Sequence, residues 1–287
     1  MPPRTSPTVR QQRLGIELRK MRVQADMTPQ AMAAALGTDP PKIAQMESGK
    51  AGISADRLRS WAAAGKCDNT RLIDALTAMT QDRGRHWWDE YRGKLSAGFL
   101  DTAEMEWHSS GSVSWAITYI PGLLQTVAYA GAIFARVRPP LPRHEVDLRT
   151  AFRIQRQSMS VGGEKPHTSF IHEAALRMRF GGPAILRAQL DSLLEDSERP
   201  NVVIRVVPFE VNTFPGQAEN LRLIAGVVPE LDTVQVDLTH GTQFVHSEAE
   251  LHTYRNMMVE VEEVALSPQE SRDFIHRVGK ELKGKAR

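Results

Sequence analysis

Lysine and glutamine side chains recur between residues 42 and 50 in a pattern that suits the reading of DNA bases. Lys42 and Gln45 lie three residues apart, so a helix would place both on one face. Lys50 follows in the sequence after this pair. Lysine donates well to the guanine acceptors of the major groove, and glutamine pairs with adenine through both amide atoms. The spacing therefore predicts base contacts from Lys42 and Gln45 and a phosphate contact from Lys50.

The segment that must position these side chains has the pattern of two short helices joined by a tight turn. Thr28 can cap a helix that begins at the following proline, and Gly37 provides a left-handed turn at no steric cost. A second helix is expected over 40–48, closed by a glycine. The predicted DNA contacts are Gln30, Thr38, Pro41, Lys42, Gln45 and Lys50, and the residues assigned to the structure of the motif are Gly37, Glu47 and Gly49.

Residues 13–66 resemble the helix-turn-helix domain of the phage-repressor/Cro type, also called the xenobiotic-response-element (XRE) family. The resemblance rests on Leu18, Arg19, Thr28, Met32, Ala33, Leu36, Gly37, Ile43, Glu47 and Gly49. It implies a small helical domain that binds double-stranded DNA. It also implies a structural role for the acidic residue at position 47, for which Arg19 is a candidate partner.

Two adjacent prolines, Pro40 and Pro41, depart from that family's pattern at the start of the second helix. Proline has no amide donor, so phosphate binding at this helix terminus should be weak. The residue before a proline avoids the α region. We therefore expect Pro40 to be the cap and Pro41 the first helical residue, with base recognition moved inward to Lys42 and Gln45.

Charge is unevenly distributed along the 287 residues. The net charge is +2, but residues 1–70 contain eleven Lys/Arg against six Asp/Glu, which is +5 and leaves −3 for the remainder. A basic excess on the helix-turn-helix half suits attraction to phosphates. The single cysteine, the lack of a long apolar run and an N-terminus without a signal-peptide core predict a cytoplasmic, nucleoid-associated protein with no membrane partner.

The pattern of apolar residues predicts a mostly α protein with an α+β second domain. We expect a flexible arm (1–12), a five-helix DNA-binding domain (13–80), a helical connector (81–106), a helix-rich regulatory or partner-binding domain with a small β-sheet (107–283) and a tail (284–287). The first helix is expected over 12–25, with arginines on its outer face. A helix is also expected within 104–119. Predicted strands are 168–171, 202–207, 221–224, 233–238 and 243–246.

Four segments of the second half resemble a second family. They are PGLLQTVAYA (121–130), HEAALRMRFGG (172–182), VVIRVVPF (202–209) and ALSPQES (265–271). These look like the carboxy-terminal domain of uncharacterised function in many actinobacterial helix-turn-helix regulators, over roughly 107–275. The resemblance implies an antitoxin-like regulator, often encoded beside a small partner protein.

Other groupings give weaker indications of chemistry. His240, His246 and His252 recur every six residues, but the stretch spans a strand, a cap and a helix, so we favour surface histidines over a metal site. Serines at 109, 110 and 112 follow His108 without a nucleophile elbow or an oxyanion feature. No phosphate loop, dinucleotide fingerprint or HExxH is present. We therefore expect no enzyme activity, no cofactor and no metal.

Three functions remain as alternatives. The first is a dimeric transcription regulator that binds a pseudo-palindromic operator through the helix at 40–48. The second is an antitoxin-like module that binds a partner protein through the edges of its strands or an apolar surface, and that autoregulates its operon. The third is a small-molecule sensor built on the aromatic region 87–119, in which core packing is the alternative role of the rings. The candidate ligand or partner residues are Trp107, Trp115, Tyr119, Leu123 and Leu124.

Overall fold

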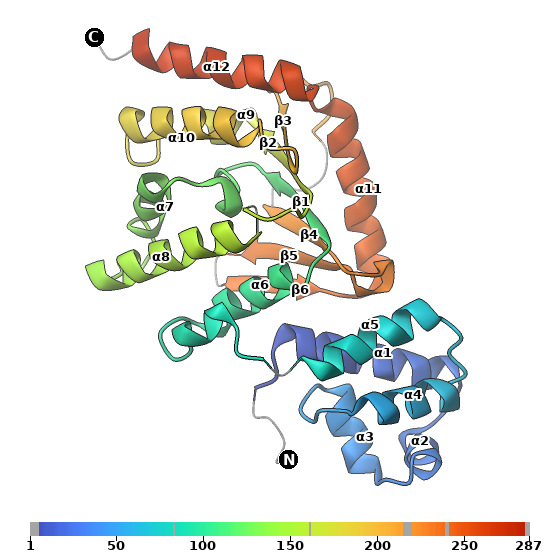
Figure 1. Cartoon of the computed structure of the whole chain (residues 1–287). Helices are drawn as coiled ribbons and strands as arrows, with labels where there is room; N and C mark the ends of the chain where they lie inside the picture. Colours follow the sequence, from blue (N-terminus) through green and yellow to red (C-terminus); the bar gives the residue numbers. More distant parts are fainter. Residues whose placement is uncertain (1–5, 83, 161, 215–219, 239–240, 285–287) are drawn as a thin grey trace. The chain divides into compact units, whose positions relative to one another are not determined.

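The computed structural model describes residues 6–82, 84–160, 162–214, 220–238 and 241–284 (Figure 1). The chain divides into two compact units. Unit 1 comprises residues 1–108 with 226–231, and unit 2 comprises 109–225 with 232–287. The boundary at 108 lies close to the expected start of the second domain at 107. None of the helices in the described ranges is long and apolar enough to cross a membrane.

Unit 1 is helical. Its elements are α1 (Val9–Gln24), α2 (Pro29–Ala35), α3 (Pro40–Glu47), α4 (Ala55–Ala64), α5 (Thr70–Gln81), the 3-10 helix η1 (Trp87–Tyr91) and α6 (Ala97–Trp107). Helix α1 begins earlier than expected, because Thr8 and Gln11 form a capping box at its start. Residues 9–12 of the predicted arm are therefore helical, and residues 1–5 lie outside the described residues. Ser54 is the N-cap of α4, and its hydroxyl accepts from the Arg57 amide.

A fully buried tryptophan and a close helix contact hold unit 1 together. Trp61 donates its indole N–H to the Leu18 carbonyl at 2.9 Å, so its polar atom is satisfied within the core. A Cβ at Gly15 would lie 2.4 Å from the Glu47 carbonyl oxygen. Only a glycine therefore allows α1 to approach the end of α3 this closely.

Residues 226–231 complete the core of unit 1, although they lie far along the chain. Val228 and Leu231 are buried in the same hydrophobic cluster as Trp61. Asn69 donates to the Glu230 carboxylate at 2.7 Å. Sequence reasoning assigned this segment to the second domain, because nothing in its local pattern indicates a distant packing partner.

Unit 2 is built on a six-stranded mixed sheet with the order β3-β2-β1-β4-β5-β6. The strands β1, β2 and β3 are parallel, and the pairs β1–β4, β4–β5 and β5–β6 are antiparallel. The bounds are β1 (Gly111–Ala116), β2 (His167–His172), β3 (Val202–Val207), β4 (Leu221–Ala225), β5 (Thr233–Leu238) and β6 (Gly241–Val245).

The expectations for this sheet were partly wrong. The sheet is larger than the small one predicted, and β1 lies where a helix was expected, since α6 ends at Trp107. Ser112 and Ser114 share one face of β1, where they hydrogen-bond to His167 and Ser169 of the neighbouring strand, and Val113 and Trp115 lie on the other face.

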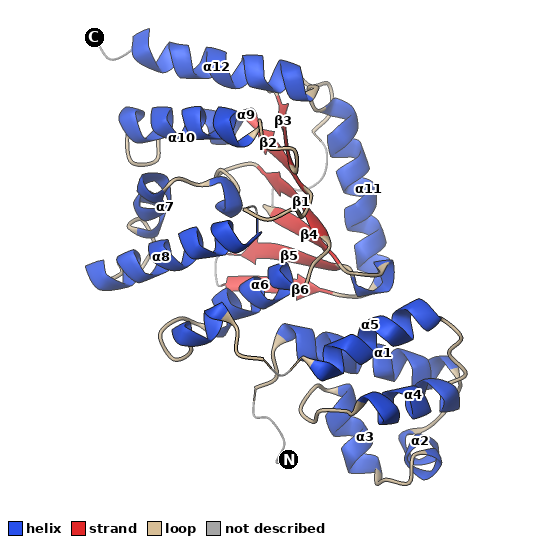
Figure 2. Cartoon of the chain, in the orientation of Figure 1, coloured by secondary structure: helices blue, strands red, loops and turns tan. Residues whose placement is uncertain are grey.

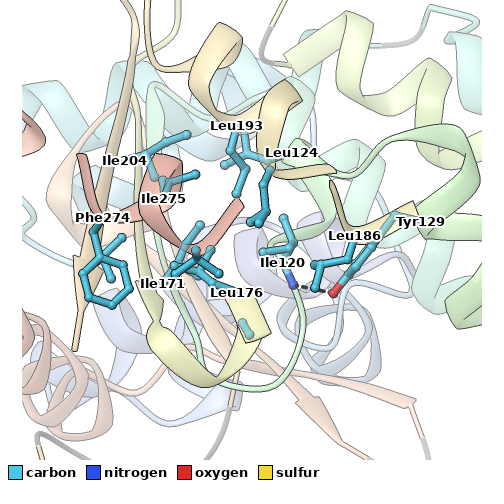
Figure 3. Close-up of a cluster of buried hydrophobic side chains, with 14 of the residues drawn as sticks. Ile120, Leu124, Tyr129, Ile171, Leu176, Leu186, Leu193, Ile204, Phe274 and Ile275 are labelled. Atoms are coloured by element: carbon cyan, nitrogen blue, oxygen red, sulfur yellow. Dashed lines mark hydrogen bonds between the residues drawn. The ribbon is translucent and has the colours of Figure 1, made fainter. Parts of the chain in front are cut away.

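Helices cover both faces of the sheet (Figure 2). The helices α7 (Val127–Phe134), α8 (Arg143–Ser160) and α10 (Pro183–Asp196) lie on one side, and α11 (Glu248–Val264) lies on the other. The first side holds the core shown in Figure 3, in which the Tyr129 hydroxyl accepts from the Ile120 amide at 3.4 Å. The remaining elements of unit 2 are η2 (Gly122–Leu124), α9 (Glu173–Arg177) and α12 (Pro268–Gly284), and η3 (Pro229–Leu231) belongs to unit 1.

Candidate nucleic-acid interface

The turn between α2 and α3 has the backbone that its sequence predicts. Gly37 has φ +59° and Gly49, after α3, has φ +74°, both in the left-handed region that favours glycine. A Cβ at Gly49 would also lie 2.8 Å from the Gln11 carbonyl oxygen. The Thr28 hydroxyl caps α2 by accepting from the Ala31 amide at 3.1 Å. These features define the start of α2, the turn after it and the end of α3.

Helix α3 begins at Pro40, which agrees with the expected range of 40–48 and not with the expected start at Pro41. Asp39 is the N-cap, and its carboxylate accepts from the Lys42 amide at 3.0 Å, so the expected cap at Pro40 is wrong. Pro40 and Pro41 occupy the first two helical positions, where an amide has no partner within the helix and its absence costs no hydrogen bond. With two prolines and a capped Lys42 amide, this terminus offers no amide donor to a phosphate.

The two faces of α3 differ sharply in exposure. Ile43 and Met46 are buried at 0% and 4% relative exposure, whereas Pro41, Lys42 and Lys50 are exposed and Gln45 is half-buried. The outward face therefore carries the residues that were assigned to base contacts. Gln30 is exposed at the start of α2, and Thr38 is half-buried in the turn, where its amide donates to the Ala33 carbonyl at 2.9 Å.

Lys42 has a partner in the absence of DNA. Its ammonium nitrogen lies 3.0 Å from the second carboxylate oxygen of Asp39, and hydrogen bonding from Lys42 holds the pKa of Asp39 below its usual range. Both side chains are more than half exposed, and exposed ion pairs of this kind contribute little. A base or a phosphate can therefore replace Asp39 as the partner of Lys42.

Glu47 points into unit 1. Its two carboxylate oxygens accept from Nε and Nη2 of Arg22 at 2.5 and 3.0 Å, and Arg22 also donates to the Met27 carbonyl at 2.7 Å. Hydrogen bonding to Glu47 raises the pKa of Arg22. The partner is Arg22 and not Arg19, which is exposed one helical turn earlier on α1. This bidentate pair ties α1 to the end of α3.

Comparison with known protein families matches two parts of the chain, one toward each end. Residues 13–74 match a helix-turn-helix domain, and residues 99–277 match a domain of unknown function (DUF5753). The chain belongs to the DUF5753 family. Searches of curated proteins and of solved structures each found no match. The helix-turn-helix domain makes this DUF5753 protein a DNA-binding regulator of transcription.

The basic excess of the DNA-binding half is only partly available to DNA. Arg13 is buried and donates to Glu17 and to the Glu230 carbonyl, and Arg22 is buried against Glu47. The expectation that these arginines lie on the outer face of α1 was wrong. Their aliphatic stems and paired head groups fill space between helices, which a charge count along the sequence does not reveal.

The candidate ligand residues of the DUF5753 chain come from both units and differ in exposure. Trp107 belongs to unit 1, whereas Trp115 is fully buried in unit 2. The Tyr119 ring packs against Phe180 with 4.8 Å between ring centres and 41° between the ring planes. Leu123 and Leu124 are also buried, at 4% and 2% exposure, so the expected apolar partner surface around them was wrong. Three of the five are core residues, with Leu123 and Leu124 in one cluster and Trp115 in another, whereas Trp107 and Tyr119 are exposed at 41% and 39%.

Among the described residues, His246 and His252 belong to no group of three or more potential metal ligands. His252 hydrogen-bonds to Asn256 at 3.0 Å, the His246 ring lies 3.5 Å from the Thr233 hydroxyl, and His240 falls outside the described residues. Within the described ranges, the structure instead gathers Asp82, His86 and His108. Sequence reasoning missed this group because its two histidines are 22 positions apart in the chain. The only local signal is the spacing of four between Asp82 and His86.

Proposed function

We propose that this regulator reads a specific operator through α3, as a dimer on a pseudo-palindromic site. The observation that supports it is the polarity of α3, which is seated in the domain core by Ile43 and Met46 and presents Lys42 and Gln45 outward. A single small helix-turn-helix contacts about half a site, so useful affinity ordinarily requires two copies.

The blocked start of α3 implies a division of roles. Phosphate contacts come from Lys50 and from Gln30 beside the start of α2, while Lys42 and Gln45 contact base edges. Lys42 exchanges Asp39 for a guanine acceptor on binding. Asp39, at the same end of the helix, repels phosphate and disfavours a shifted docking register.

The test begins by mapping the DNA sites that the protein occupies in its host and measuring affinity for matched and mismatched operators. Gln45→Ala should cost about 1–3 kcal/mol and relax preference at one base pair per half-site. Equal weakening on matched and mismatched operators would contradict that role.

Lys50→Ala should weaken binding to all sequences alike and lower the salt slope by about one. Lys280→Ala is the matched control, because it removes the same charge from an exposed position on α12. If Lys50→Ala changed sequence preference, or if Lys280→Ala reproduced its salt effect, the phosphate role of Lys50 would be wrong.

The dimer is tested separately by equilibrium sedimentation of the free protein and of the protein bound to a mapped operator. We expect two chains per operator, with the spacing of half-sites near one helical turn of DNA or a multiple of it. A single chain bound to the complete operator would contradict this part of the proposal.

A second candidate function is the binding of a partner protein by strand addition. Strand β6 lies at one end of the sheet, and in the described part of the chain it pairs with β5 alone. An edge of this kind can accept an extended segment from another chain. With a partner recovered from native lysate, slowed amide exchange in residues 241–245 would support the role, and unchanged exchange there would contradict it.

A further inference from the structure

Three side chains that could hold a metal ion meet in unit 1. Nε2 of His86 lies 3.0 Å from one carboxylate oxygen of Asp82, and Nε2 of His108 lies 2.9 Å from the other. The candidate donor atoms all lie within 4.8 Å of one another. Ligands bound to zinc at ordinary lengths stand about 3.3 Å apart in a tetrahedral site. Only small side-chain movements would bring the three around one ion.

Each donor comes from a defined position in the fold. Asp82 caps the end of α5, His86 immediately precedes η1, and His108 caps the end of α6. The His86 ring is stacked on Trp88, with ring centres 4.5 Å apart and an angle of 6° between the planes. Because Trp88 is buried, this stacking limits the rotation of the imidazole.

The surroundings favour a cation despite a nearby arginine. Arg10 donates to Asp82 at 3.2 Å, on the oxygen nearest His108. Arg10 also interacts with Glu104, so two carboxylates oppose one guanidinium when both imidazoles are neutral. The carboxylate of Asp82 can ligate through one oxygen while the other keeps its bond to Arg10. Such second contacts commonly orient metal ligands.

The three side chains are partly open to solvent. The three side chains retain 19–25% of their exposure. His86 also lines a hollow of about 320 Å³ together with Arg85, Trp87 and Glu90. The group therefore combines convergent donors with a solvent-facing hollow beside His86. Two histidines with a carboxylate form a donor set that suits divalent first-row transition ions.

We propose that Asp82, His86 and His108 form a binding site for one divalent transition-metal ion, of the zinc type, with water completing the coordination. The ion links the end of α5 to the end of α6 within unit 1. It holds the last helix of the helix-turn-helix region against the segment that follows. This inference concerns metal binding alone and does not depend on DNA recognition.

The test is a titration of the full-length, metal-free protein with Co²⁺, followed by displacement with Zn²⁺. We expect one Co²⁺ per chain, visible d–d absorption bands and quenching of tryptophan fluorescence, because Trp88 is stacked on a ligand. His108→Gln and Asp82→Asn should each weaken binding by at least about 100-fold, since loss of an outer-shell partner alone costs 10–100-fold.

The double variant His246→Ala/His252→Ala is the matched control. It removes two histidines of unit 2 and should leave Co²⁺ affinity, stoichiometry and spectrum unchanged. Thermal melting of each metal-free variant establishes that it is folded. The proposal is overturned if folded wild-type protein binds no Co²⁺, if folded His108→Gln and Asp82→Asn bind it as tightly as wild type, or if the control loses binding.

Discussion

His167 should make the stability of unit 2 depend on pH. It lies on β2 at 3% exposure, and its ring is held between two hydroxyls, with Nδ1 2.8 Å from Ser112 Oγ and Nε2 2.9 Å from Ser169 Oγ. Neutral imidazole suits this position, because a serine hydroxyl can either donate or accept. Burial lowers the pKa of His167 to about 4.

The direction and size of the effect follow from the two end states. In the unfolded chain a histidine has a pKa of about 6.5, so the unfolded state gains a proton as the pH falls below that value while the folded state does not. Between about pH 7.5 and about pH 5, His167 should therefore lower the free energy of unfolding by about 2 kcal/mol. The loss reaches about 3 kcal/mol near pH 4, where the folded state begins to bind the proton as well.

Hydrogen exchange measured on peptides from β1 and β2 reports the opening of this region in the full-length protein. His167→Met removes the titration and leaves a constant offset from the altered hydrogen bonds. The difference between wild type and variant should therefore shrink by about 2 kcal/mol from about pH 7.5 to about pH 5. His144→Met is the control, since His144 is exposed. A difference that stays constant with pH would refute the reasoning.

Two further substitutions test the core of unit 1. Glu47→Gln keeps the shape of the side chain but leaves Arg22 as a buried cation without its carboxylate. It should therefore lower the free energy of unfolding, measured by urea titration, by about 3 kcal/mol. A change within experimental error would contradict the structural role of this pair. Leu231→Ala should lower the stability of unit 1 by about 2 kcal/mol and so speed amide exchange in α1 and α5, although Leu231 is distant from both helices in sequence. Faster exchange in unit 2 alone would show that residues 226–231 do not belong to the core of unit 1.

Elements with local signals were predictable from the sequence. Ser54 caps α4 and Thr28 caps α2, each through its own hydroxyl and an amide three residues later. Strands β3 and β5 carry apolar, β-branched residues and were predicted with their observed bounds. In these cases the side chain and the backbone group that it stabilises are close neighbours in the chain.

Features that depend on distant partners were not predictable in this way. Strand β1 contains serines on a buried face, and only the positions of His167 and Ser169 on β2 show why they are tolerated there. The same limit applies to residues 226–231 and to the group around Asp82. Their local sequences resemble ordinary loop and helix-end sequences, and the fold alone brings them to their partners.

The formal net charge likewise does not predict how many cations the protein can present to DNA. The +5 of residues 1–70 includes Arg13 and Arg22, whose charges are offset inside the domain by Glu17 and Glu47. Each pair neutralises one positive and one negative charge, so the net charge of these residues stays +5. The number of cations that can contact phosphate nevertheless falls. Counterion release scales with contacts and not with net charge. The salt slope of operator binding should therefore follow the exposed cations around α3 rather than the eleven basic residues of this half.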